Sequence, residues 1–149
     1  MKIITLTLCP AFDLHCFTRG FKPFHENSAD ITAFDAGGKG VNISRALSAG
    51  GTDNLAIVAV GADNGAEFLK RLDADGVKYE KIEVPGRIRE NITVHTDDAP
   101  ETRISFKGFS VDGGFTKRVR EVVLENAEQG AVVTFTGRLP DGADRKSVV

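Results

Sequence analysis

The chain has 149 residues, 41% hydrophobic and 27% charged, a composition typical of one soluble domain. Nineteen basic against twenty-one acidic residues give a net charge of −2, which argues against nucleic-acid or anionic-membrane partners. No apolar stretch approaches the ~20 residues of a membrane span, and the start of the sequence is unlike a signal peptide, so we expect a cytoplasmic protein.

Strand and helix patterns alternate along most of the chain. They predict strands at Lys2–Leu8, Asn54–Val60, Tyr79–Val84 and Ala131–Thr136, of which the first and the last are expected to be buried. Between these strands they predict helices from Val41 onward, at Gly65–Leu72 and at Phe115–Ala127. Asn64, followed three residues later by Glu67, resembles a capping box. Strands alternating with helices indicate right-handed βαβ units and a mostly parallel sheet.

Two segments, about 14–36 and 91–108, interrupt this alternation. Segment 14–36 has no helical period and contains four phenylalanines. Segment 91–108 predicts two strands, 91–97 and 102–108, whose alternation is that of a half-exposed antiparallel sheet. We expect a small projecting β-sheet that acts as a lid or a dimer surface; the alternative is a pair of hairpins without a functional role.

The pattern near the end of the sequence predicts a loop at 139–142 and allows a helix to begin within Ala143–Val149. The buried strand before this loop would leave a sheet edge and one apolar face uncovered. We therefore expect the chain to self-associate through the lid or through this edge.

The run Gly37–Leu47 reads Gly-Gly-Lys-Gly-Val-Asn-Ile-Ser-Arg-Ala-Leu and points most directly to chemistry. Its glycines leave backbone N–H groups bare where a helix begins, and a helix N-terminus favours an anion or a hydroxylated ligand. Lys39 adds a positive charge, and Asn42 offers a donor and acceptors to hydroxyl groups. The run predicts a sugar or sugar-phosphate site; the alternative is a glycine-rich turn that only starts a helix.

Two other glycine motifs are excluded by spacing. A P-loop would need Gly at the position of Ala33 and Ser or Thr at that of Gly40. A dinucleotide fingerprint beginning at Gly38 meets Ile43 in place of its third glycine, which disfavours a dinucleotide-binding domain.

Cysteines and histidines occur close together in the first part of the chain. Cys9, His15, Cys16 and His25 have a spacing that fits no standard zinc pattern, so we expect no metal site. Two cysteines also make no disulfide framework.

Four segments resemble the PfkB carbohydrate kinase family (the ribokinase superfamily), and within it the 1-phosphofructokinase and tagatose-6-phosphate kinase group. They are Thr5–Asp13, Gly37–Leu47, Arg89–Asn91 and Thr136–Gly142. They occur in family order at family-like separations, so the resemblance covers essentially the whole chain. It implies a ribokinase-like α/β fold, with a mostly parallel sheet flanked by helices and a small projecting β-sheet lid.

The resemblance also implies a substrate site. Its residues would be Asp13, Gly37, Gly38, Lys39, Asn42, Arg89 and Asn91. Asp13 would accept hydrogen bonds from sugar hydroxyls and Asn42 would bond another hydroxyl, while the two glycines would let the backbone approach the sugar. Lys39 and Arg89 would hold the substrate's phosphate.

The sequence departs from the family pattern at two positions near this site. Cys9 stands where the family usually has Asn, and Arg138 stands where Ser is usual. Arg138 either adds a phosphate contact or blocks the usual loop geometry.

The resemblance further implies what this sequence lacks. Family members are considerably longer, and their C-terminal half carries the ATP site and a Gly-Ala-Gly-Asp motif whose Asp is the general base. That motif is missing from this sequence. We therefore interpret residues 1–149 as the N-terminal substrate-binding part, with no catalytic residue of its own. ATP and Mg²⁺ are expected in the full-length enzyme only, and the chain alone is expected to be inactive.

The function that the resemblance implies is ATP-dependent phosphorylation of a ketohexose phosphate. Fructose 1-phosphate, converted to fructose 1,6-bisphosphate, is the favoured substrate, and tagatose 6-phosphate comes next. The alternative is a non-catalytic sugar-phosphate-binding or dimerisation module. A homodimer through the β lid is the expected assembly.

Overall fold

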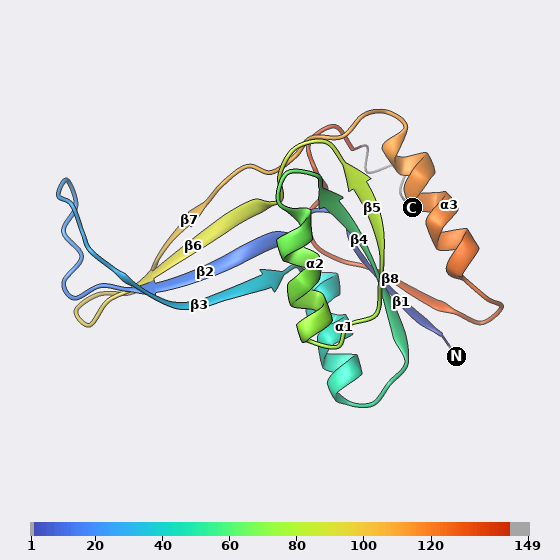
Figure 1. The fold of residues 1–149 in the computed structure, drawn as a ribbon, viewed down its shortest axis with the longest axis horizontal. Helices are drawn as coiled ribbons and strands as arrows, with labels where there is room; N and C mark the ends of the chain where they lie inside the picture. The colour runs from blue at the N-terminus through green and yellow to red at the C-terminus, as the bar shows by residue number, and fades with distance from the viewer. Residues whose placement is uncertain (1, 144–149) are drawn as a thin grey trace.

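The computed structural model describes residues 2–143, so nearly all of the segment in which a last helix was expected, Ala143–Val149, lies outside the described residues. The described part contains two four-stranded sheets and three helices (Figure 1). In chain order they are β1 Ile3–Thr7, β2 Ala11–Phe17, β3 Asp30–Gly37, α1 Lys39–Ala49, β4 Asn54–Gly61, α2 Gly65–Ala74, β5 Tyr79–Val84, β6 Arg89–His95, β7 Thr102–Ser105, α3 Phe115–Asn126 and β8 Val132–Phe135.

The first sheet, sheet A, has the order β5-β4-β1-β8, and all its neighbouring strands are parallel. Figure 1 shows α1 and α2 on one face of this sheet and α3 on the other. Strands joined by helical crossovers and covered on both faces form a doubly wound α/β layer. The predicted fold class is confirmed. The helix expected from Val41 begins two residues earlier, at Lys39.

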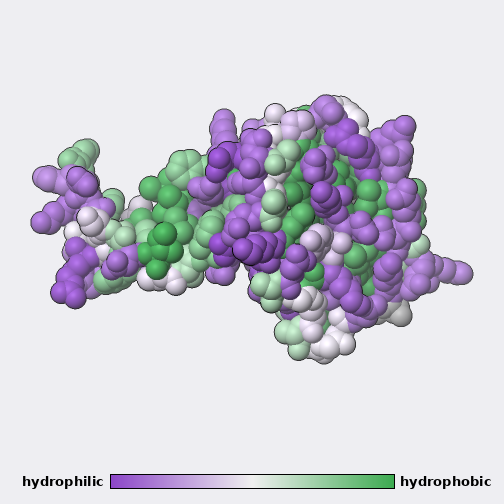
Figure 2. Space-filling model, viewed as in Figure 1, coloured by the Kyte–Doolittle hydropathy of each residue, from purple (hydrophilic) through white to green (hydrophobic). Residues whose placement is uncertain are grey.

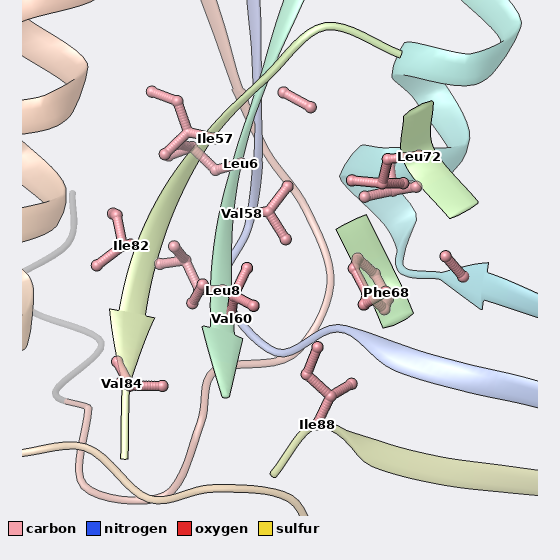
Figure 3. Packing of buried hydrophobic residues seen from close by; sticks show 14 of the residues in the cluster. Leu6, Leu8, Ile57, Val58, Val60, Phe68, Leu72, Ile82, Val84 and Ile88 are labelled. Atoms are coloured by element: carbon pink, nitrogen blue, oxygen red, sulfur yellow. The ribbon is translucent and has the colours of Figure 1, made fainter. Parts of the chain in front are cut away.

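The hydrophobic core lies between sheet A and its helices (Figure 3). Leu6 from β1 and Val58 from β4 are buried in it, and α2 contributes the fully buried Phe68 and Leu72. Phe68 packs edge-on against Phe12 at the start of β2, with ring centroids 5.4 Å apart. The core therefore continues from sheet A into the base of the second sheet.

The second sheet, sheet B, has the order β3-β2-β6-β7 and projects from the α/β layer in Figure 1. It contains both segments that interrupted the sequence pattern. The antiparallel arrangement expected for segment 91–108 is correct for β6 with β7. β2 and β3 also pair antiparallel, whereas β2 and β6 pair in parallel. The reason is that β2 follows the carboxyl end of β1 and β6 follows that of β5, so both leave sheet A in the same direction.

The strand register gives sheet B one polar and one apolar face. Directly paired residues share a face, so Asp13 lies with Asn91, whereas Leu14 lies with Ile92 and Ile104 on the opposite face. Figure 2 shows hydrophobic surface over the projecting sheet, beside a more hydrophilic tip. Ile31 and Ile104 are 70% and 47% exposed.

The last strand of sheet A corrects one expectation. Ala131–Thr136 was expected to be a buried strand, but Val132, Val133 and Phe135 of β8 are exposed. Among residues 2–143, β8 occupies an edge of the sheet and pairs only with β1. Local apolar character predicts the strand, but burial depends on which neighbours cover it.

The prediction of a capping box at the start of α2 is wrong. The Asn64 side chain makes no capping bond; its amide oxygen instead accepts from the Ile88 N–H at 2.8 Å, and its amide nitrogen donates to the Ile88 carbonyl at 3.0 Å. Glu67 forms an ion pair with Arg71. Asn64 thus joins α2 to the segment that leads into β6.

Within residues 2–143, none of the helices has the length and apolar character needed to cross a membrane. The cytoplasmic location stays a prediction.

Candidate functional site

A cavity of about 420 Å³ lies at the carboxyl ends of β1 and β8. The strand order reverses at this point: β4, the next strand of sheet A after β1, lies on one side of β1, whereas β8 lies on its other side. In open α/β sheets such a reversal leaves a crevice for ligands. The N-terminus of α1 and the beginnings of β2 and β6 complete the walls. The lining residues are Thr7, Leu8, Cys9, Ala11, Asp13, Gly38, Lys39, Asn42, Arg89, Asn91, Thr136, Gly137 and Arg138.

The tertiary structure brings the predicted site residues together from distant parts of the chain. Asp13, Gly38, Lys39, Asn42, Arg89, Asn91 and Arg138 all line this cavity. Gly37 does not; it is buried beneath Asp13 and lines a neighbouring cavity. Residues more than 120 positions apart thus share one site because β1 and β8 are adjacent.

Three polar side chains form a hydrogen-bonded chain along one wall. The Asn91 amide donates to the Asp13 carboxylate at 2.8 Å, and Arg89 Nη1 donates to the Asn91 amide oxygen at 2.9 Å. Asn91 therefore orients both its neighbours. Asp13 keeps acceptor capacity for ligand hydroxyl groups, because a carboxylate offers about four lone-pair sites.

The glycine run is required by close packing. A Cβ at Gly37 would overlap the Asp13 carboxylate, one at Gly38 would overlap the Thr7 methyl group, and one at Gly40 would overlap the Leu6 carbonyl. Gly38 also has φ 140°, which L side chains rarely adopt. These glycines thus allow α1 to begin against β1 and leave room for Asp13.

The first turn of α1 faces the cavity with partly unpaired backbone donors. Thr7 Oγ1 accepts from the Val41 N–H at 2.8 Å, and Gly38 provides no side-chain cap. Arg45 donates to the Asn42 amide oxygen at 2.9 Å, so the Asn42 amide nitrogen is left to donate to a ligand. The helix N-terminus therefore presents N–H donors and a partial positive charge to the cavity.

Three cationic side chains line the cavity. Lys39, Arg89 and Arg138 come from α1, from β6 and from the loop after β8. Arg89 and Arg138 border it beside Cys9, whose thiol has its pKa raised by burial, an effect partly offset by the Arg89 guanidinium. The thiol is thus held neutral between two arginines.

The carboxylate and the two arginines lie toward different sides of the cavity. Asp13 and Asn42 also line a neighbouring cavity on the side of β3, whereas Arg89 and Arg138 also line another on the side of the 105–109 segment. The cavity therefore has one side with the Asp13 carboxylate and another side with two guanidinium groups.

Sequence reasoning missed several contributors. Thr7 and Thr136 line the cavity, and the Thr136 hydroxyl is buried without a hydrogen-bond partner among the described residues, as is Arg89 Nε. Asn54, Arg71 and Arg118 also have a buried polar atom without a partner and lie outside this cavity, so these two atoms do not by themselves indicate a ligand. Both threonines lie in segments that carry the family resemblance, Thr5–Asp13 and Thr136–Gly142, and this was the signal that could have identified them.

The cavity combines hydrogen-bond donors and cations with one carboxylate. That carboxylate belongs to Asp13, and the cations belong to Lys39, Arg89 and Arg138. Among residues 2–143, no group of three or more His, Cys, Asp or Glu side chains is placed to hold a metal ion. Cations and amide donors beside a carboxylate can bind a ligand that carries both phosphate and hydroxyl groups.

Comparison with known proteins finds phosphofructokinases among the relatives of this chain. The chain is 29% identical over 143 residues to the ATP-dependent 6-phosphofructokinase isozyme 2 of Escherichia coli K12, an alignment covering 95% of this chain and 46% of that protein. It is 30% identical over 141 residues to 1-phosphofructokinase from the same organism, covering 95% and 45%. The chain thus spans about half the length of these relatives.

Solved structures show the same fold. The crystal structure of phosphofructokinase-2 from Escherichia coli in complex with fructose-6-phosphate matches with a TM-score of 0.90 at 28% identity, over 99% of this chain and 48% of that one. A possible 1-phosphofructokinase from Thermotoga maritima matches with a TM-score of 0.78 at 27% identity, over 97% and 47%.

The family assignment rests on nearly the whole sequence. Residues 7–149 match the family described as pfkB family carbohydrate kinase, in agreement with the resemblance of the four segments. The chain therefore belongs to the pfkB family of carbohydrate kinases.

Proposed function

We propose that this chain supplies the sugar-phosphate site of an ATP-dependent ketohexose-phosphate kinase, with fructose 1-phosphate as the favoured substrate and tagatose 6-phosphate next. The observation that carries the proposal is the chain from Asp13 through Asn91 to Arg89, which couples a hydroxyl acceptor to a phosphate-binding cation in one cavity. ATP and Mg²⁺ belong to the full-length protein in this proposal, together with the general base.

The residues of this chain bind and orient the sugar in the proposed reaction. Asp13 accepts hydrogen bonds from sugar hydroxyls, and the Asn42 amide nitrogen donates to another. Lys39, Arg89 and Arg138 neutralise the phosphate that the sugar already carries. Phosphoryl transfer depends mainly on positioning and charge stabilisation, so a rigid acceptor site is a substantial part of catalysis.

The test is calorimetric titration of the 149-residue chain with fructose 1-phosphate, fructose 6-phosphate and tagatose 6-phosphate, with MgATP in parallel. We expect a sugar phosphate to bind and MgATP not to bind. Asp13→Asn, which keeps the shape of the side chain, should abolish sugar-phosphate binding. Failure of every sugar phosphate to bind the unaltered chain would refute the proposal.

The alternative of a non-catalytic binding or dimerisation module predicts the same ligand but no kinase activity in the full-length protein. The two are separated by assaying that protein with MgATP and the sugar phosphate that binds best. A bisphosphate product supports the kinase, and binding without turnover supports the module.

A homodimer through sheet B is also part of the proposal. Support comes from Ile31 and Ile104, which expose the apolar face of this sheet, opposite the face that carries Asp13. Burying such a face against a second copy would remove apolar surface from water. Light scattering should show a dimer, and Ile31→Glu should convert it to a monomer.

A further inference from the structure

A cavity of about 390 Å³ adjoins the sugar-phosphate cavity on the side of β3. Asp13 and Asn42 line both cavities, so the two are continuous along these side chains. His15, two residues after Asp13 on β2, also lines the neighbouring cavity and has no role in the site described above. We call this neighbouring cavity the side cavity.

The free oxygen of the Asp13 carboxylate lies toward the side cavity. Its Oδ1 accepts from the Asn91 amide at 2.8 Å, whereas its Oδ2 lies where a Cβ at Gly37 would overlap it. Gly37 lines the side cavity. A ligand hydroxyl that donates to Oδ2 therefore lies where the two cavities meet, close to the strand that carries His15.

His15 is hydrogen-bonded to His95 of the neighbouring strand β6. Nδ1 of His15 and Nε2 of His95 are 3.0 Å apart. The ring centroids are 5.3 Å apart, which is this distance plus the radius of each ring, and the ring planes differ by 13°. Both nitrogens thus lie on the line between two nearly coplanar rings, where one of them donates its proton and the other accepts it.

Glu101 favours one direction for this hydrogen bond. Its Oε2 is 3.7 Å from Nδ1 of His95, the ring nitrogen that does not face His15. A neighbouring carboxylate favours the tautomer whose proton is on the nearer nitrogen. Nε2 of His95 then carries no proton and accepts from the Nδ1–H of His15. Because a neutral histidine has one ring proton, Nε2 of His15 is left as a bare acceptor.

The side cavity offers acceptors to a ligand. In the part of the chain that the structure describes, Nε2 of the half-buried His15 has no hydrogen-bond partner. The cation that lines the cavity, Arg45, is neutralised by Asp75 in an ion pair of 2.7 Å. The carboxylates of Asp13 and Asp35 complete the charged groups of its lining. Such a lining suits the hydroxyl groups of a sugar and not its phosphate.

We propose that His15 is a specificity-determining residue of the sugar site, whose Nε2 accepts a hydrogen bond from a sugar hydroxyl beside the one held by Asp13. His95 and Glu101 are positioning residues that keep His15 in the accepting tautomer. The inference rests on the proposed function for the identity of the ligand. It selects sugars with two neighbouring free hydroxyl groups, because a ligand without the second one leaves the imidazole acceptor unpaired.

The experiment is two-dimensional ¹H–¹⁵N NMR of the histidine rings in the ¹⁵N-labelled 149-residue chain, at about pH 8, above the ordinary titration range of histidine. The sequence has only three histidines, and the exposed His25 is an internal control. Variants His15→Phe, His95→Leu and His25→Phe assign the ring signals. The titrants are fructose 1-phosphate, fructose 6-phosphate, tagatose 6-phosphate and unphosphorylated fructose.

Without ligand, we expect His15 and His95 each to carry the ring proton on Nδ1. A bound sugar phosphate should move the His15 Nε2 signal toward that of a protonated nitrogen, as accepting a hydrogen bond does, and leave His25 unchanged. His15→Phe should weaken sugar-phosphate binding about three- to tenfold, the size expected for one hydrogen bond between neutral groups. His25→Phe is the matched control and should leave the affinity unchanged.

The role of His95 is tested by two substitutions. His95→Leu removes the acceptor of the His15 Nδ1 proton, so His15 should become a mixture of tautomers and the affinity should fall. His95→Gln supplies an amide oxygen as a new acceptor and should restore both the single tautomer and most of the affinity. Equal affinity in the leucine and glutamine variants would contradict the positioning role.

Other results separate this inference from the proposed function. A sugar phosphate that binds without moving the His15 Nε2 signal, and equally well in His15→Phe, overturns the inference and leaves the proposed function standing. A ligand-free His15 with its proton on Nε2 does the same. Fructose that moves the Nε2 signal in a chain that binds no sugar phosphate supports His15 as a hydroxyl acceptor and overturns the proposed function. Absence of binding by every titrant overturns both.

Discussion

The Asp13 carboxylate accepts a hydrogen bond of 2.8 Å from the Asn91 amide, and these two residues are directly paired in the parallel register of β2 and β6. Because Arg89 donates to the same Asn91 side chain, the groups that we propose bind the sugar hydroxyls and the phosphate are parts of one hydrogen-bonded chain. A ligand that contacts Asp13 therefore finds the Arg89 guanidinium already oriented by Asn91.

Arg89→Ala should weaken sugar-phosphate binding by about ten- to a hundredfold, because hydrogen bonds to charged groups contribute about 1.5–3 kcal/mol. The fold should remain intact. Calorimetric titration measures the affinity, and Arg120→Ala on the exposed surface of α3 is the matched control. Equal affinity in both variants would remove Arg89 from the site.

Gly37→Ala should lower sugar-phosphate affinity at least about tenfold although Gly37 does not line the cavity, because the added methyl group displaces the Asp13 carboxylate from its bond with Asn91. The control is Gly113→Ala, where a Cβ would meet no atom within 4 Å. Unchanged sugar-phosphate affinity in Gly37→Ala would show that binding does not depend on the present position of the Asp13 carboxylate.

Thr7→Val should destabilise the chain by about 1–3 kcal/mol, because it leaves the buried N–H of Val41 without an acceptor at nearly constant side-chain shape. Urea denaturation followed by circular dichroism measures the free energy of unfolding. Thr102→Val on the exposed strand β7 should have little effect. Similar values for the two variants would contradict the role given to the hydroxyl.

Phe68→Ala should lower the free energy of unfolding by about 3–5 kcal/mol. The Phe68 side chain is fully buried and packs against Phe12 at the start of β2, where sheet B begins. Phe24→Ala removes the same side chain from a fully exposed position and should change stability by less than about 0.5 kcal/mol. Thermal unfolding distinguishes them. A small effect at Phe68 would mean that sheet A and sheet B are not packed through this residue.

Cys9 should be the cysteine that reacts with iodoacetamide in the folded chain, because Cys16 is buried. Burial raises the pKa of the Cys9 thiol, so its thiolate fraction and its alkylation rate should stay below those of an unfolded cysteine until the pH rises past the ordinary thiol range. The folded chain holds this proton more tightly than the unfolded chain. The stability from this group is therefore complete below the ordinary pKa and is lost as pH rises through the folded value.

Mass spectrometry counts the labels, and the matched variant Cys9→Ser should take none. Arg89→Ala should slow the reaction further, because the guanidinium lowers the thiol pKa. A bound sugar phosphate should protect Cys9. Labelling of Cys16 at a similar rate would contradict the burial on which this prediction depends.

Much of the secondary structure follows from local pattern. The apolar spacing around Phe68 and Leu72 predicts α2, and both side chains are buried in the core. The strand Tyr79–Val84 has its predicted bounds. These features depend on residues within one or two turns of each other, and such interactions are readable from a single sequence. The glycine run likewise locates the start of α1 to within two residues.

Local patterns and the four motif segments were enough to predict the types of elements, the family and most of the residues that line the cavity. Three features could be known only from the three-dimensional arrangement: the parallel pairing of β2 with β6, the bonds between Asn64 and Ile88 in place of a cap on α2, and the exposed position of β8 at the edge of sheet A. Each of these depends on partners distant in sequence, and the energy of a hydrogen bond or of burial is set by what lies opposite.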